Sequence, residues 1–255
     1  ILDFIKSLIL TALIGGAILL GILWFFQAAG ALAWFYSWIA MLVFMGFMQF
    51  ISPILIMPLF NKFTPLQEGE LKEAVNHYAQ KENFKIKGIF TMDGSRRSTK
   101  LNAFFTGFGK SKRIVFFDTL IEKISPREII SVLAHEMGHF KHRHLLKGLL
   151  ISIITSGLMF FLLSFFINNP VVFEAFNMQS ISIYASLAFF AFLYSPVNTL
   201  LGIFTNILSR KHEYQADRYA VTSTGDYVSL PEALKKLSVL NLSNLNPHPF
   251  YVFVH

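Results

Sequence analysis

The chain has 255 residues, of which 54% are hydrophobic and 15% charged, and its formal net charge is +7. A soluble domain usually carries about a quarter of charged residues, so this composition favours an integral membrane protein over a soluble enzyme or a nucleic-acid-binding protein. The chain contains no cysteine, which excludes disulfides and thiolate ligands and leaves His, Asp and Glu to hold any metal ion.

The first apolar region follows Lys6 and contains no charged residue before Lys62. A helix needs about 20 residues to cross roughly 30 Å of hydrocarbon, so the region has room for two membrane spans. We predict them at 7–28 and 36–59, joined by a neutral turn around 27–38. Tryptophans gather in this turn, as expected of an aromatic belt at a membrane interface.

The polar block 62–147 predicts a small folded α+β module. Its periodicity and turn residues indicate both helices and strands. The predicted elements before its last helix are a helix over 67–81, a strand over 86–92, and a pair of strands over 99–105 and 113–118 that is joined across the turn-rich sequence GFGKSK.

The last helix of this module begins at a capping signal. Ser125 is suited to the N-cap, Pro126 to the first helical position and Glu128 to the third, which together form a capping box. No helix breaker follows before Lys147, so we expect the helix to continue directly into the next membrane span.

The sequence HEMGH lies about ten residues into this helix. His135 and His139 are four residues apart, so their rings project from one helix face and can reach one zinc ion. Glu136 is offset by about one hundred degrees and lies beside the metal, where a carboxylate can act as the general base of peptide hydrolysis. Two nearby histidines are too distant or point elsewhere, and we interpret His142 and His144 as part of a basic face near lipid headgroups.

Two further spans follow, at 148–168 and 182–208, and an acidic pair comes soon after the second of them. Zinc at a catalytic site needs a third protein ligand and an open fourth position. We predict Glu213 as that ligand, one zinc ion being bound per chain. Asp217 lies one helical turn beyond Glu213, where it could hold a ligand histidine in its tautomer or assist proton transfer.

The Lys and Arg residues predict the topology. All 22 lie outside 7–61 and 148–209, in segments that four spans place on one side of the membrane. Basic residues near span ends mark the cytoplasmic side, which indicates a cytoplasmic polar module and a metal site near the lipid boundary. The predicted organisation is two spans in 1–61, a cytosolic catalytic module in 62–147, two spans in 148–209 and a cytosolic segment with the acidic helix in 210–255.

The motifs HEMGH, EYQAD and LNAFFTGFG, in this order and with a pair of spans between the first two, resemble the type I CAAX prenyl protease family. Bacterial membrane stress proteases are more distant relatives of that family. The resemblance covers nearly the whole chain and is far more specific than HEMGH alone. It implies a mainly α, polytopic membrane protein with seven helices around an enclosed chamber, which cleaves near the C-terminus of prenylated proteins.

The resemblance also implies roles for single residues. Zinc would be bound by His135, His139 and Glu213, with Glu136 as the catalytic base. Asp217 matches the second acidic residue of the family, which is often assigned a proton-donor role. In addition, Asn102 would lie on an edge strand beside the substrate cleft, where an extended peptide could pair with it.

The sequence departs from the family in two places. Only four spans are visible, so we expect the first three upstream of Ile1. The family also has a His-Pro-Pro run that stabilises the oxyanion; His248 is followed by one proline only, and we expect the run beyond His255.

Two other functions remain open from the sequence. One is a broad-specificity quality-control protease of a bacterial inner membrane, rather than a processing enzyme of the endoplasmic reticulum. The other is a non-catalytic membrane scaffold that holds zinc. The predicted partners are the lipid bilayer and a protein or peptide substrate that is itself membrane-anchored, with no nucleic acid.

Overall fold

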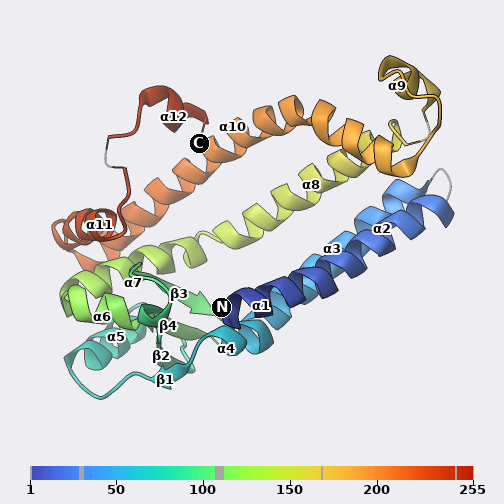
Figure 1. Cartoon of the computed structure of the whole chain (residues 1–255). Coiled ribbons are helices and arrows are strands. Elements are labelled where there is room, and N and C mark those ends of the chain that lie inside the picture. The colour runs from blue at the N-terminus through green and yellow to red at the C-terminus, as the bar shows by residue number, and fades with distance from the viewer. Residues whose placement is uncertain (1, 29–31, 107–111, 168, 245, 255) are drawn as a thin grey trace. The chain divides into compact units, whose positions relative to one another are not determined.

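The structure is a computed structural model that describes residues 2–28, 32–106, 112–167, 169–244 and 246–254. The centre of the predicted turn around 27–38, most of the sequence GFGKSK, and His255 lie outside these residues. The chain forms two compact units, residues 1–49 with 147–204, and residues 50–146 with 205–255. The first unit is helical, and the second contains helices and a small sheet (Figure 1).

Within the described residues, four helical stretches are long and apolar enough to cross a membrane, which confirms the predicted number of spans. They are Asp3–Gly21, Ala33–Phe60, His144–Ser164 and Ala185–Thr224. The first comprises α1 (Leu2–Leu10), a π-helical turn (Thr11–Gly15) and the start of α2 (Gly16–Ala28); the second comprises α3 (Ala33–Ile51), a π-helical turn (Ser52–Ile56) and α4 (Met57–Phe60). The third is α8 (His144–Ser164), and the fourth belongs to α10 (Ile183–Thr224), with the short α9 (Pro170–Ala175) between them.

Two tryptophans of the predicted aromatic belt make helix–helix contacts within the first unit. Trp34 stacks edge-on against Phe161 of α8, with ring centroids 5.3 Å apart. Trp38 donates a hydrogen bond from its indole nitrogen to Ser156 Oγ over 3.2 Å. An indole that fills a gap between apolar helices satisfies its polar group there, so these two rings contribute to packing of α3 on α8.

The sheet of the second unit has four strands in the order β1-β2-β4-β3. These are β1 (Phe63–Pro65), β2 (Gly88–Met92), β3 (Ala103–Thr106) and β4 (Arg113–Phe117). β1 is antiparallel to β2, β2 is parallel to β4, and β3 is antiparallel to β4. Three of the strands match predicted ones; β1 was missed because only three residues form it.

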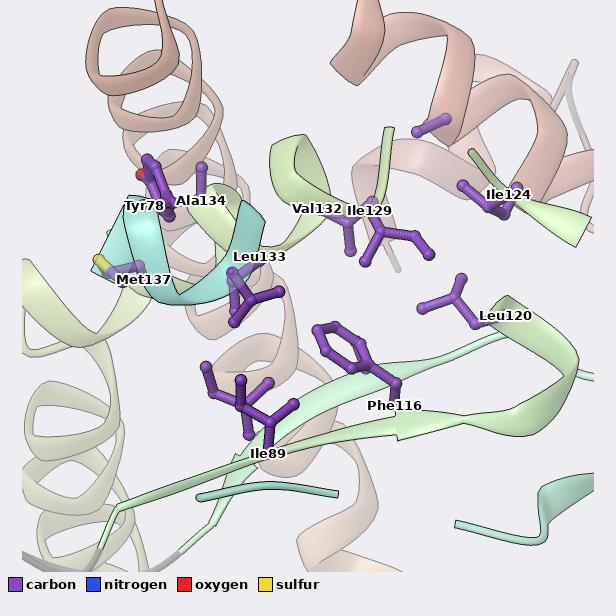
Figure 2. Close-up of a cluster of buried hydrophobic side chains, with 14 of the residues drawn as sticks. Tyr78, Ile89, Phe116, Leu120, Ile124, Ile129, Val132, Leu133, Ala134 and Met137 are labelled. Carbon is purple, nitrogen blue, oxygen red and sulfur yellow. The ribbon is translucent and has the colours of Figure 1, made fainter. Parts of the chain in front are cut away.

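The core of this unit lies between one face of the sheet and α7 (Pro126–Lys141). Figure 2 shows Val132 and Leu133 of α7 on the side of the core opposite Phe116 of β4 and Ile89 of β2. α5 (Glu70–Lys81) and α6 (Asp118–Lys123) complete the core, with Tyr78 and Leu120. Period-two alternation along β4 sends Ile114 and Phe116 into this core, which leaves the neighbouring side chains on the other face.

The predicted continuous helix through HEMGH into the third span is wrong. α7 ends at Lys141 and α8 begins at His144. Between them Arg143 adopts φ +56°, in the left-handed region, so the chain changes direction without a glycine or proline. The side-chain contacts that accompany this break form part of the site described below.

The end of the chain returns to the second unit. The last two helices are α11 (Ser229–Leu240) and α12 (Pro249–Val254). α11 packs against α7 through Leu230 and Ala233, which are both buried. Their spacing with Leu237 follows the helical period, so the amphipathic pattern of α11 was present in the sequence.

Candidate metal centre

The helix that carries HEMGH begins at a complete capping box. The Glu128 backbone nitrogen donates to Ser125 Oγ over 3.4 Å, and the Ser125 nitrogen donates to Glu128 Oε2 over 3.0 Å. Both orphan donors at the start of α7 are therefore satisfied, as the sequence predicted. A fixed helix start and a buried apolar face on the sheet together set the direction in which the histidines point.

His135 and His139 of α7 meet Glu213 of α10 at one point. Their Nε2 atoms are 3.1 Å apart. Glu213 Oε2 lies 3.3 Å from His135 Nε2 and 3.6 Å from His139 Nε2. These are the three residues that the sequence analysis selected as metal ligands, and the structure brings them together from helices that are far apart in the chain.

The spacing of these three atoms fits a zinc ion. Nitrogen and oxygen ligands at about 2.0–2.1 Å from a tetrahedral ion lie about 3.3–3.4 Å from one another. The three separations observed here, 3.1, 3.3 and 3.6 Å, are close to that value. The donor set of two imidazoles and one carboxylate is also that of catalytic zinc sites with an open fourth position. The residues present therefore fit the ion that the sequence implies.

A glycine allows α7 and α10 to approach this closely. A Cβ atom on Gly138 would lie 2.8 Å from Ala216 Cα and 3.0 Å from the Ala216 carbonyl oxygen. Those atoms belong to the backbone of α10 and cannot rotate away. Ala216 is itself fully buried, so the contact is dry as well as short.

Each histidine is oriented through its other ring nitrogen. His135 Nδ1 lies 2.8 Å from Asp217 Oδ1, and a carboxylate can only accept, so Nδ1 carries the proton. The lone pair of His135 is then left on Nε2, the atom nearest Glu213. Asp217 is thus placed behind the ligand atom rather than in the ligand set.

His144 orients the second ligand, contrary to the prediction that it points elsewhere on a basic surface. Only 6% of His144 is exposed. Its Nε2 donates to Gln215 Oε1 over 2.9 Å, and its Nδ1 lies 3.0 Å from His139 Nδ1. Because His144 Nδ1 then accepts, His139 Nδ1 donates and keeps its lone pair on Nε2. The break between α7 and α8 turns His144 back onto this position.

Glu136 stands beside the ligands, half-buried on the same helix. Burial raises the pKa of this carboxyl, and the nearby Glu213 raises it further, whereas His135 and His139 act in the opposite direction. A carboxyl with a raised pKa is a stronger proton acceptor at neutral pH than an ordinary surface glutamate.

A cavity of about 120 Å³ adjoins His135 and Glu136. Its other lining residues are apolar except for Asn102. They come from α6, α7, α11 and the start of β3, and they are Leu101, Ala103, Leu120, Val132, Leu230, Leu234 and Leu237. The arrangement offers a small apolar recess next to a proton acceptor.

Asn102 lies immediately before β3, which is an edge strand of the sheet. The residue is exposed, and its side-chain oxygen accepts a hydrogen bond from the Ala103 nitrogen over 2.9 Å. Its backbone oxygen accepts from the Phe117 nitrogen over 3.0 Å, which extends the pairing of β3 with β4. The outer edge of β3 begins beside the cavity that contains Glu136.

Three residues of this site have roles that the sequence did not predict, and they are Gly138, His144 and Gln215. Glycine inside a helix costs about 1 kcal/mol relative to alanine, so Gly138 within a strong helix was a signal of close packing. The roles of His144 and Gln215 had no comparable local signal, because their contact joins residues 71 positions apart.

Comparison with known families gives matches over nearly the whole chain. Residues 65–252 match the model of peptidase family M48, and residues 1–62 match that of the CAAX prenyl protease N-terminal region with five membrane helices. The first match contains HEMGH and all the residues that surround it.

The chain is similar to proteins of plants, fungi and animals. The chain is 39% identical to CAAX prenyl protease 1 homolog of Oryza sativa subsp. japonica, over 99% of this chain and 60% of that protein. It is 36% identical to CAAX prenyl protease 1 of Saccharomyces cerevisiae, over 100% of this chain and 60% of that protein. It is 34% identical to the CAAX prenyl protease 1 homolog of Homo sapiens, over 94% of this chain and 58% of that protein. The chain thus spans about three fifths of the length of these relatives.

A solved structure shows the same fold. The crystal structure of S. mikatae Ste24p superposes with a TM-score of 0.90 at 37% sequence identity. The match covers 99% of this chain and 62% of that one.

Proposed function

Because this chain belongs to peptidase family M48 and its N-terminal part to the CAAX prenyl protease type, we propose that the protein is a membrane-embedded zinc endopeptidase. Its substrates are membrane-anchored proteins that are prenylated at a CAAX sequence, and it hydrolyses peptide bonds near their C-termini. The observation that carries the proposal is the convergence of His135, His139 and Glu213 at zinc spacing, with the Glu136 carboxylate beside them.

In this proposal His135, His139 and Glu213 hold one zinc ion. Zinc supplies Lewis acidity when bound, which polarises the substrate carbonyl and lowers the pKa of the attacking water. Asp217 and His144 act as positioning residues, because each fixes the tautomer of one ligand histidine through its far ring nitrogen. The geometry of Asp217 favours this orienting role over direct proton donation.

Glu136 is the general base. Its carboxylate takes a proton from the attacking water and passes it to the leaving amine, so that no free charge is released into a partly buried site. The raised pKa of Glu136 suits both transfers, since the group has to accept a proton and then give it up within one reaction cycle.

The substrate chain binds as an added strand along the outer edge of β3. An extended peptide can pair with a free strand edge through main-chain hydrogen bonds, and Asn102 lies where such a peptide would reach Glu136. The apolar recess beside Glu136 fits an aliphatic side chain next to the bond that is cleaved.

The second unit, residues 50–146 with 205–255, holds the candidate metal ligands and is called the metal unit below. We place its metal site on the cytoplasmic side of the membrane because the Lys and Arg residues lie in the segments that adjoin it. The chain contains no cysteine, so single cysteines introduced into it can report on topology once any cysteine in the rest of the full-length protein is replaced. Lys123→Cys should be labelled by an impermeant maleimide only after the cytoplasmic side is opened, and Gln179→Cys only from the opposite side. Labelling of both from one side would overturn the placement.

The decisive experiment is a cleavage assay with a full-length protein that carries this chain. Prenylated CAAX peptides, unprenylated CAAX peptides and an unprenylated misfolded membrane protein are compared without chelator, with chelator, and again after zinc is restored. We expect cleavage of the prenylated peptide, its loss with chelator and its return with zinc. Equal cleavage of unprenylated misfolded membrane proteins would favour a quality-control protease, and zinc binding without any cleavage would favour a scaffold.

A further inference from the structure

The sheet of the metal unit has a second face that the metal site does not use. Ile114 and Phe116 of β4 point toward α7, so Arg113 and Val115 point the other way. Phe90 of β2 is the register partner of Val115 and lies on the same face as it. The face formed by these side chains is therefore opposite the helix that carries the ligand histidines.

A cavity of about 650 Å³ covers this second face. One wall is the sheet, and the other is the chain from Phe50 to Asn61, which comprises the last turns of the second membrane span and α4. Figure 1 shows α4 leading into the sheet at β1. The lining residues are Phe50, Pro53, Ile54, Met57, Pro58, Asn61, Phe63, Lys87, Phe90, Thr106, Arg113 and Val115. Because one wall is the end of a span, the cavity lies where hydrocarbon gives way to lipid headgroups.

The charges of this cavity are of one sign. Among the residues that the structure describes, its lining includes Lys87 and Arg113, both exposed, and no Asp or Glu. The Arg113 guanidinium lies over the Phe90 ring, 5.3 Å from its centroid, which holds this cation at the edge of the apolar surface. The side chains of Asn61 and Thr106 add polar groups to the lining.

These features match one class of ligand. The volume lies within the usual range for small-molecule sites, of roughly 300–1,000 Å³. An apolar wall continuous with a membrane span accommodates an acyl chain, and two cations without a competing carboxylate accommodate a phosphate. A zwitterionic lipid would bring its own ammonium group to the same two cations, which makes it a poorer fit.

We propose that this cavity is a binding site for an anionic membrane phospholipid. The lipid phosphate is held by Lys87 and Arg113, and one acyl chain lies against Ile54, Met57 and Phe90. The site is separate from the metal centre, so it does not depend on the proposed peptidase activity. Its occupation would hold the end of the second span against the sheet that supports α7.

The test measures lipid binding by the purified full-length protein, delipidated in detergent, with dioleoyl phosphatidylglycerol as the probe. Native mass spectrometry and thermal unfolding report binding, and both are independent of catalysis. We expect phosphatidylglycerol to raise the melting temperature and dioleoyl phosphatidylcholine to have little effect. In Lys87→Gln/Arg113→Gln the affinity for phosphatidylglycerol should fall by on the order of tenfold.

A charge-matched control is available on the same unit. Lys123 and Lys235 are exposed lysines that do not line the cavity, and Lys123→Gln/Lys235→Gln should retain wild-type binding. Equal weakening by both double variants, equal binding of phosphatidylcholine, or equal protection by inorganic phosphate would each overturn the proposal. Zinc content should be unchanged in all variants, which shows that each of them is folded.

Discussion

In the part of the chain that the structure describes, two helix pairs approach closely at a glycine, and the two contacts differ in kind. In the metal unit, Gly138 of α7 meets the backbone of Ala216 on α10. In the first unit, residues 1–49 with 147–204 and called the membrane unit below, Gly157 of α8 meets the indole ring of Trp38 on α3. A Cβ added to Gly157 would lie 3.1 Å from the nearest ring atom. Backbone atoms cannot move aside, whereas a side chain can shift by a few tenths of an ångström.

The difference follows from what each pair of helices has to do. α7 and α10 must bring three ligand atoms within 3.6 Å of one another, which fixes the distance between the helix axes. α3 and α8 only have to exclude lipid from between them, and several side-chain arrangements achieve this. The metal unit should therefore tolerate change far less than the membrane unit, and five predictions test that contrast.

The largest effect is expected at the proposed base. Glu136→Gln should retain zinc and lower the rate of peptide cleavage by about 10²–10⁴-fold, because the amide cannot accept a proton. Cleavage kinetics and elemental analysis of the full-length protein measure the two quantities. Wild-type cleavage by this variant would remove Glu136 from the mechanism.

Gly138→Ala tests the backbone contact. The added methyl group has no space beside Ala216, so α7 and α10 should separate, with a loss of stability of about 1–3 kcal/mol and reduced zinc content. The loss of the helical circular dichroism signal during denaturation in detergent measures the stability. Elemental analysis measures the zinc content. A variant with unchanged zinc content would show that the site tolerates a wider separation.

His144→Ala tests whether the centre depends on its orienting contacts. Without His144 the far nitrogen of His139 loses its partner, and zinc affinity should fall by about 10–100-fold. The matched control is His142→Ala, because His142 is exposed and lies only two residues away. Competition with a chelator of known affinity measures both variants, and similar values for the two would exclude a positioning role for His144.

A pH-dependent contribution to the free energy of unfolding is expected at the start of α11, the helix that packs on α7. Hydrogen bonds from the Ser229 hydroxyl, and from the Ser229 and Val228 nitrogens, lower the pKa of Asp226 below its usual value. The stabilisation is therefore present above pH ~4 and is lost as the pH falls through the lowered pKa of the folded protein. Asp226→Asn should lose about 1 kcal/mol at neutral pH, because a neutral amide accepts these hydrogen bonds more weakly than a carboxylate does.

The control for Asp226 is the pH itself. Below the lowered pKa, wild type and Asp226→Asn should converge in their free energy of unfolding, since both are then uncharged at this position. A difference that stayed constant down to low pH would assign the effect to packing. α3 and α8 contain no acidic residue, so the membrane unit offers no comparable titration there.

The smallest effect is expected for Gly157→Ala in the membrane unit. Trp38 can move slightly to admit the methyl group, so we expect a change in stability below about 1 kcal/mol and no change in zinc content. The same denaturation assay as for Gly138→Ala measures it. A loss as large as that of Gly138→Ala would break the contrast between the two helix pairs.

The amino-acid sequence by itself determined the features that depend on neighbours within one or two helical turns. The four spans follow from apolar length, and the start of α7 follows from the capping box at Ser125. The placement of His135 and His139 on one helix face follows from their spacing of four residues. Each of these features rests on local geometry that a short stretch of chain fixes alone.

Only the tertiary structure decided the rest of the site. Nothing in the local sequence interrupts the helix before Lys147, yet Arg143 adopts a left-handed conformation and His144 turns back to contact His139 and Gln215. The sequence predicted that Asp217 could hold a ligand histidine, but only the structure shows that its partner is His135, 82 positions away. Such contacts form because the packed helices repay the local strain with buried hydrogen bonds, and that balance depends on residues that meet only in the folded protein.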